Sequence, residues 1–322
     1  MGRVAQLTEI PCEPMTVDSH VTVIRPDLDQ VDGPYFGYAL RKIQPQIEAM
    51  GEGATGQTEL SCHRLGDEIL VGLPPLPIQR KIAAALAAYD ELIENNLRRI
   101  EILEEMAQAI YREWFVNFRY PGHKADDLVA SPLGPIPEGW EVTRLGDRLE
   151  FAYGKALKRQ DRREGDVAVY GSSGVVGWHD RALVEGPGIV VGRKGNVGAV
   201  HWSDGDFYPI DTTFFVRTDL PLEYVLRNLR NQNFINSDAA VPGLNRQQAY
   251  GNPLLVPGAD VLERYDTVVK PLTAFRRKVE QQNANLRATR DLLLPKLVSG
   301  AIDVSDLDTG FEFWAIPIDD GA

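Results

Sequence analysis

Two long stretches of the chain carry apolar residues at alternating spacings of three and four positions. In the first, which predicts a helix over about 77–120, the seam is Leu86, Tyr89, Ile93, Asn96, Ile100, Leu103, Ala107, Ile110 and Trp114. In the second, predicted over about 258–300, it is Leu272, Phe275, Val279, Gln282, Leu286, Thr289 and Leu293. Such spacing is typical of a helix that buries one stripe against another helix. A helix of about 40 residues is roughly 60 Å long.

The two stretches match each other at a constant offset of 186 positions, so Asn96 and Gln282 occupy equivalent positions in their seams. A polar residue in such a seam costs stability and can fix register. Packing of each helix inside its own domain is the alternative, but the shared register favours mutual antiparallel packing. We then expect Asn96 and Gln282 to bond each other or water near the middle of the pair; the rival is that both face solvent and the seam is rotated by one position. On this basis Asn96→Leu should raise the melting temperature and loosen the spacing that the helices set.

Strand-like segments precede each long helix. Residues 15–25 alternate like a strand, 35–50 predict an amphipathic helix, and 69–77 predict a buried strand with a proline turn. Further strands are predicted at 167–170, 188–191, 197–202 and 212–216, before a helix from 221 to about 237. Pro271 should kink the second long helix or end its first turns. The predicted fold is α+β, with β-rich domains alternating with two long antiparallel, coiled-coil-like helices.

Composition narrows the class of protein. The 322 residues suffice for about two domains. The net charge of −12 argues mildly against nucleic acid, but residues 301–322 hold six acids and no base, so local patches matter more. Cys12 and Cys62 support neither a disulfide framework nor a metal cluster. Without a long apolar run or a secretory leader, the expected location is the cytoplasm.

Glycine-rich and basic loops carry the candidate chemistry. The turn 192–198 lacks the Gly-Lys-Ser/Thr ending of a nucleotide loop and precedes a strand, so it is a hairpin turn, with Gly195 and Asn196 left-handed, that can present Arg193 and Lys194. The small-residue loop 170–174, the basic run 155–163 and the loop 242–246 are either plain turns and solvated faces or contacts to phosphates and base edges. The five histidines show no metal spacing, and no catalytic motif is present. The chain is therefore expected to be a reader of nucleic acid without cofactor, metal or catalysis.

Several motifs together resemble a known family. These are Leu73-Pro-Pro-Leu-Pro-Ile-Gln-Arg-Lys-Ile82, Gly139-Trp-Glu-Val142, Tyr170-Gly-Ser-Ser-Gly-Val-Val-Gly177, Gly192-Arg-Lys-Gly195, Asp211-Thr-Thr213 and Leu292-Leu-Leu-Pro-Lys-Leu-Val-Ser-Gly300. Over 2–303 the chain resembles the specificity subunit of type I restriction-modification systems. The resemblance implies binding of double-stranded DNA by recognition domains, helices that set the gap between half-sites, and assembly with methyltransferase (modification) and restriction/translocase subunits. The resulting candidate DNA-binding residues are Lys155, Lys158, Arg159, Tyr170, Ser172, Ser173, Arg193, Lys194, Thr212, Asn245 and Arg246.

The resemblance also predicts a division of the chain. It assigns 1–76 to the C-terminal part of a first, truncated recognition domain, 77–120 and 258–300 to the long helices, 121–139 to a linker, 140–257 to a complete second recognition domain, and 301–322 to an acidic tail. Asp18 to Arg25 resembles Asp211 to Arg217, so the first domain lacks a portion equivalent to about 140–191. A second copy or a split N-terminal fragment could supply it. The alternative function is a scaffold or decoy that binds methyltransferase subunits without reading DNA.

Overall fold

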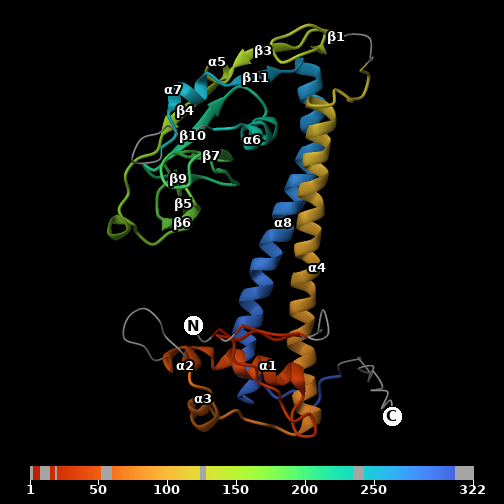
Figure 1. Ribbon diagram of the computed structural model, residues 1–322, viewed down its shortest axis with the longest axis vertical. Coiled ribbons are helices and arrows are strands. Elements are labelled where there is room, and N and C mark those ends of the chain that lie inside the picture. Colours follow the sequence, from red (N-terminus) through yellow and green to blue (C-terminus); the bar gives the residue numbers. More distant parts are fainter. Residues whose placement is uncertain are drawn as a thin grey trace. The chain divides into compact units, whose positions relative to one another are not determined.

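The computed structural model describes residues 3–7, 15–18, 20–51, 60–123, 128–234 and 243–308. The chain divides into two compact units, which are described separately. Unit 1 comprises Met1–Ile100 and Arg277–Ala322, and unit 2 comprises Glu101–Arg276. Helices α4 (Leu76–Phe115) and α8 (Ala259–Val298) contribute residues to both units (Figure 1). The mixed helix and strand content and the two long helices confirm the predicted fold class.

The regular secondary structure of unit 1, over its described residues, is helical. It contains α1 (Gly33–Lys42), α2 (Gln44–Ala49), α3 (Cys62–Glu68) and parts of α4 and α8. Asp32 caps α1 by accepting a hydrogen bond from the backbone N–H of Tyr35 at 3.0 Å. One core cluster joins α1, the start of α4 and the end of α8; it contains Tyr35, Tyr38, Ala39, Ile82, Ala83, Leu86, Leu297 and Val304. The tertiary packing of unit 1 therefore depends on residues from both ends of the sequence.

Two predictions for unit 1 were wrong, and one helix was not predicted. Residues 15–18 and 20–25 form no strand, and Val21 and Val23 are about half exposed. No described strand of this unit lies beside them, so their alternation has no sheet to bury it. Residues 69–77 form no buried strand, since Leu70 is 89% exposed and α4 begins at Leu76. Helix α3 was not predicted; Ser61 caps it by accepting from the N–H of Arg64.

Within unit 1, α4 and α8 pair antiparallel. Asn96 bonds Asn283, and six residues earlier in α4, Asp90 contacts Arg290, seven residues later in α8. The α4 seam is buried or half-buried from Leu86 to Trp114, as its spacing predicts.

The predicted α8 seam is displaced by one residue at alternate positions. Val279, Leu286 and Leu293 lie on the inner side, but Phe275 is 50% exposed and Gln282 and Thr289 are also exposed. Arg276, Asn283 and Arg290 take the inner places instead. Apolar spacing alone does not identify these positions, because two of them are arginines that pair with acids of α4.

The ends and continuity of the long helices also differ from prediction. Helix α4 ends at Phe115 rather than near 120, and Phe118 has a left-handed backbone with φ of 56°. Helix α8 continues through Pro271, which neither ends it nor delays its start. Pro271 and Thr267, whose carbonyl loses its helical partner, are both exposed, so water can satisfy that carbonyl. Gly300, two residues after α8, has a positive φ of 75°, typical of a helix terminus.

Unit 2 is built around antiparallel strands. The main sheet has the order β4 (Leu149–Tyr153), β10 (Thr213–Thr218), β7 (Gly188–Gly192) and β8 (Val200–Ser203). A second sheet has the order β6 (Gly174–His179), β5 (Val167–Gly171) and β9 (Phe207–Pro209), with β5 and β9 parallel. Smaller pairs join β11 (Pro253–Val256) to β3 (Glu141–Arg144) and β1 (Leu128–Val129) to β2 (Ile136–Pro137). The four strands predicted between 167 and 216 are confirmed.

Short helices complete unit 2. They are α5 (Leu145–Arg148), the 3-10 turn η1 (Arg159–Asp161), α6 (Leu222–Asn231) and α7 (Arg246–Tyr250). Helix α6 ends earlier than the predicted 237, and residues 235–242 lie outside the described part of the chain.

Both faces of the main sheet are covered. Phe151, Val191 and Phe214 belong to a large cluster that includes Tyr224 of α6 and Tyr111, Trp114 and Phe115 of α4. Their neighbours in sequence, Ala152, Val190 and Phe215, belong to a second cluster with Tyr170 and Phe207 of the smaller sheet. This alternation is the two-residue period of a strand. Because both faces are packed, the ends of the strands and their connecting loops supply the exposed backbone.

Candidate nucleic-acid interface

Loops from different strands of unit 2 meet at one place. The N–H groups of Arg193 and Lys194, in the β7–β8 turn, both donate to the carbonyl of Thr212, at 2.9 and 3.1 Å. The carbonyl of Arg193 accepts from the N–H of Leu244, which precedes α7, at 2.8 Å. The N–H of Asn196 donates to the Ser172 hydroxyl in the β5–β6 turn at 3.4 Å. We call this group of loops, residues 153–155, 171–174, 193–198, 209–212 and 243–246, the loop cluster.

Glycine permits the close approach of these loops. A Cβ on Gly154 would lie 2.2 Å from the carbonyl oxygen of Ile210 and 2.5 Å from that of Pro209. Beside it, the N–H of Lys155 donates to the carbonyl of Pro209 at 3.0 Å. Gly195 has a φ of 82°, as expected for a left-handed turn residue, but Asn196 does not, and Gly198 takes the second positive φ instead. Side chains larger than hydrogen are therefore excluded where the loops cross.

Arg193 is anchored along one edge. Its Nε and Nη2 donate to the carbonyl oxygen of Asp211 at 3.1 and 2.6 Å. Its guanidinium carbon lies 5.4 Å from the ring centre of Tyr153 and 5.9 Å from that of Phe214. The side chain is thus fixed by hydrogen bonds and by cation–π contacts.

Arg246 approaches the same tyrosine. Its guanidinium carbon lies 4.9 Å from the Tyr153 ring centre, and Nη1 donates weakly to the carbonyl of Phe151 at 3.5 Å. Tyr153 is 52% exposed, so a ring flanked by two guanidinium groups reaches the surface. Among the described residues, neither Arg193 nor Arg246 forms an ion pair with a carboxylate. The loop cluster therefore offers positive charge to an external anion or acceptor.

The structure distributes the remaining candidates unevenly. Lys155, Ser173 and Lys194 are exposed within the loop cluster, whereas Ser172 and Thr212 are half-buried there. Lys158 and Arg159 are exposed in the segment that follows the cluster, at η1.

Two candidates have structural tasks instead. Tyr170 is 7% exposed and its hydroxyl donates to the carbonyl of Trp202 at 2.9 Å, so this side chain supports the fold, and its contact with DNA stays a prediction. Asn245 is the N-cap of α7, where its side-chain oxygen accepts from the N–H groups of Gln247 and Gln248. That oxygen is therefore not available to read a base.

Sequence reasoning missed Tyr153 as a member of the site. Nothing in the local sequence shows that Arg193 and Arg246 converge on this ring. The basic run itself is partly used internally. Arg162 donates from Nη1 to the carbonyl of Val176 at 2.7 Å, and Arg163 lies 3.6 Å from Asp180. No group of metal-binding side chains occurs in the described ranges, and none of the helices there combines the length and apolarity that a membrane crossing demands.

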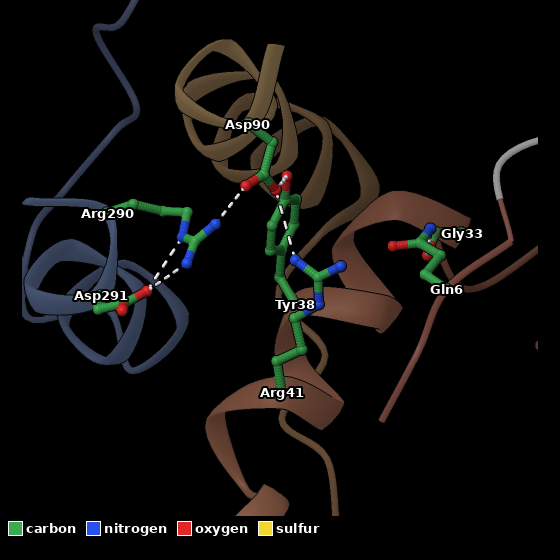
Figure 2. Close-up of polar contacts among 7 residues, drawn as sticks. All are labelled: Gln6, Gly33, Tyr38, Arg41, Asp90, Arg290 and Asp291. Carbon is green, nitrogen blue, oxygen red and sulfur yellow. Dashed lines mark hydrogen bonds and ion pairs between the residues drawn. The ribbon is translucent and has the colours of Figure 1, made fainter. Parts of the chain in front are cut away.

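A second polar centre, shown in Figure 2, lies in unit 1. The carboxylate of Asp90, on α4, accepts from the Tyr38 hydroxyl of α1 at 2.7 Å and from Arg290 Nη1 of α8 at 2.5 Å. Nη1 of Arg41 lies 3.4 Å from Oδ2 of the same carboxylate. Burial alone would raise the pKa of Asp90, but the hydrogen bonds from Tyr38 and Arg290 and the two positive charges outweigh it, so this pKa is lowered. The centre joins α1 to both long helices and is structural, since its donors and acceptors satisfy one another.

Several known proteins are similar to this chain in sequence. Residues 2–105 match the family model for the type I restriction modification DNA specificity domain. The specificity subunit of the type I restriction enzyme MjaIX of Methanocaldococcus jannaschii is 25% identical over 325 residues, which cover 91% of this chain and 74% of that one. The putative MjaX specificity subunit of the same organism is 28% identical over 134 residues, covering 41% of this chain and 31% of that protein.

A solved structure shares the fold. The S subunit of a type I restriction-modification system from M. genitalium superposes with a TM-score of 0.57 at 20% identity, covering 84% of this chain and 74% of that one. By sequence, the chain is similar to the specificity subunits of type I restriction-modification systems. Subunits of this family are not catalytic, and the chemistry of the complex belongs to other subunits.

Proposed function

We propose that this chain selects the DNA sequence on which a type I restriction-modification complex acts, and that residues 140–257 read one half-site. The observation that carries the proposal is the loop cluster, where Lys155, Arg193, Lys194 and Arg246 gather without carboxylate partners among the described residues. Exposed lysines suit phosphate contacts that place the domain on a duplex, and anchored side chains suit contacts to base edges. The local charge of the cluster thus opposes the net charge of −12.

The partners follow from the family. The names of the relatives place them in type I restriction enzymes, and we infer that this chain likewise assembles with methyltransferase and restriction/translocase subunits on double-stranded DNA. A second copy of the chain or a split N-terminal fragment of the specificity subunit is a further proposed partner, which would help form the domain that reads the other half-site. Location in the cytoplasm is proposed on the same grounds.

Methylation mapping tests the recognition proposal. The chain is co-expressed with its methyltransferase subunits in a host without other methylation, and methylated bases are located by sequencing of the genomic DNA. Methylation confined to one short motif is the expected result. A stable complex that methylates no motif supports the scaffold or decoy alternative and overturns sequence recognition.

We also propose that α4 and α8 set the distance between the half-site read by unit 2 and a second half-site. The support is their length, 40 residues each, and their antiparallel pairing. Inserting one heptad after Arg98 of α4 and one after Gln281 of α8 keeps the seam in phase and adds about 10 Å. At roughly 3.4 Å per base pair the unspecified gap of the methylated motif should grow by about three base pairs. An unchanged gap rejects the spacing role, and a heptad in α4 alone is the control that breaks the pairing.

A further inference from the structure

One edge of the Arg193 guanidinium is occupied, and no described residue bonds the other edge. A guanidinium offers paired N–H groups along its side edge, from Nε and Nη2, and along its end edge, from Nη1 and Nη2. The carbonyl of Asp211 accepts from both nitrogens of the side edge. The second N–H of Nη2 and one of the two N–H bonds of Nη1 point along the end edge. Arg193 is therefore a preformed donor pair.

The plane of this donor pair is fixed from several sides. Tyr153 and Phe214 lie under the guanidinium, and the backbone of Arg193 bonds both Thr212 and Leu244. The side chain is half-buried, whereas its neighbour Lys194 and the nearby Lys155 are exposed. The lysines thus project further into solvent than the arginine and reach phosphates more readily. A recessed, planar and immobile donor pair suits a flat base edge.

We propose that Arg193 reads a guanine in the half-site that unit 2 recognises, by donating from Nη1 and Nη2 to the O6 and N7 atoms in the major groove. This assignment rests on the proposed function. Guanine matches because it presents two adjacent acceptors there, whereas adenine presents one acceptor beside a donor. Tyr153 and Asp211 are positioning residues, since they hold the guanidinium without meeting the base.

Base analogues test the assignment on the assembled complex of the full chain with its methyltransferase subunits. Each guanine of the mapped half-site is replaced, one at a time, by 7-deazaguanine, which lacks the N7 acceptor, and dissociation constants are measured. At one position the native complex should lose roughly 5- to 150-fold in affinity. The complexes of Arg193→Ala and Arg193→Lys should bind the unmodified site more weakly by a similar factor and lose nothing further at that position. Lysine keeps the charge but not the planar pair.

Arg217→Ala is the matched control. Arg217 also stacks on an aromatic ring, that of Phe215 at 5.1 Å, but it pairs with Glu150 near the other end of β10. This variant should keep the native response to the analogue.

Each contrary result has a distinct meaning. If no guanine replacement weakens native binding more than about twofold while the complex still prefers its site, guanine reading by Arg193 is overturned and the proposed function stands. If both Arg193 variants weaken all duplexes equally and keep the native response to the analogue, Arg193 contacts a phosphate, which also overturns the assignment. If the complex shows no site preference, the proposed function fails with it. Arg193→Lys keeps the test valid should Arg193→Ala not assemble.

Discussion

Two buried amide side chains in the helix seam are hydrogen-bonded to each other. Asn96 is 8% exposed and donates from Nδ2 to Asn283 Oδ1 at 3.0 Å, while Asn283 is 2% exposed and donates to the carbonyl of Ile93 at 3.1 Å. The sequence alignment had pointed to Gln282, which the structure leaves exposed. An apolar replacement of one member leaves the other without its partner in a buried place. The effect of a substitution on stability therefore depends on whether the other amide of the pair is replaced as well.

Asn96→Leu should lower the melting temperature, contrary to the expectation from sequence alone. The buried oxygen of Asn283 would lose its donor, which costs about 1–3 kcal/mol. The double variant Asn96→Leu/Asn283→Leu removes both polar groups and should melt at or above the native temperature. Thermal unfolding followed by circular dichroism measures both.

Gln282→Leu is the control for this pair, because its side chain is exposed and its melting temperature should change little. An Asn96→Leu protein that melts higher than the native chain would show that the pair does not hold as described.

Asp90→Asn should lower the free energy of unfolding at neutral pH by about 1–2 kcal/mol, because charge-assisted hydrogen bonds from Arg290 and Tyr38 are weakened. The folded pKa of Asp90 is lowered, so its contribution is present above the unfolded pKa of about 3.9 and is lost as the pH falls through the folded value. The difference between the native chain and the variant should therefore close in acid. Urea unfolding at pH 7 and pH 3 measures it.

Asp291→Asn serves as the comparison, since Asp291 is 63% exposed and touches Arg290 from the solvent side. Equal losses in both variants at pH 7 would argue against a special role of Asp90.

At the scale of elements, the sequence predicted well those strands and helix faces that local spacing determines. The strands between 167 and 216 and the α4 seam follow from two-residue and three-four periods, which need no knowledge of the partner. What it missed depends on contacts distant in sequence. Residues 15–18 and 20–25 alternate with no strand beside them in the described part of unit 1, and Arg276 and Arg290 take inner places on α8 because Glu104 and Asp90 face them. Tyr153 became a site residue only through residues about 40 and 90 positions away.

Gly154→Ala should destabilise unit 2, because the new methyl group would meet the backbone carbonyls of Pro209 and Ile210, which cannot rotate away as a side chain can. Forced overpacking of this kind costs roughly 1–3 kcal/mol. We expect a lower melting temperature and weaker DNA binding from the displaced loop cluster, measured by circular dichroism and by titration of the complex with its duplex.

Gly205→Ala is the matched control, since nothing lies within 4 Å of a Cβ at that position. Its melting temperature should equal that of the native chain. A Gly154→Ala protein that behaves like Gly205→Ala would contradict the close approach of the loops.

At the scale of the whole molecule, the excess of acids sets the background for DNA binding. With 46 acidic and 34 basic side chains, the chain as a whole repels a phosphate backbone, so attraction depends on a few local cations. The contribution of each exposed lysine in the loop cluster should then be separately measurable. This distinguishes placement on DNA from reading of its bases.

Lys194→Gln should weaken binding of the complex to all duplexes by about the same factor, because a phosphate contact carries no sequence information. The slope of log affinity against log salt concentration should fall in magnitude by about one. Fluorescence anisotropy between 50 and 300 mM salt, about the range where such slopes are linear, measures both quantities. A change confined to the cognate duplex would mean that Lys194 contacts a base.

The split composition of unit 1 has a consequence for how the protein is made. Unit 2 is one continuous stretch, so all of it has left the ribosome once Arg276 has emerged. Unit 1 needs Leu297 and Val304 to pack against Tyr35, Ile82 and Leu86, which are synthesised about 210–270 residues earlier. At about 5–20 residues per second, those apolar side chains wait roughly 10–55 s for their packing partners. Residues 35–86 of unit 1 are therefore translated before unit 2 is complete and complete their packing only after it.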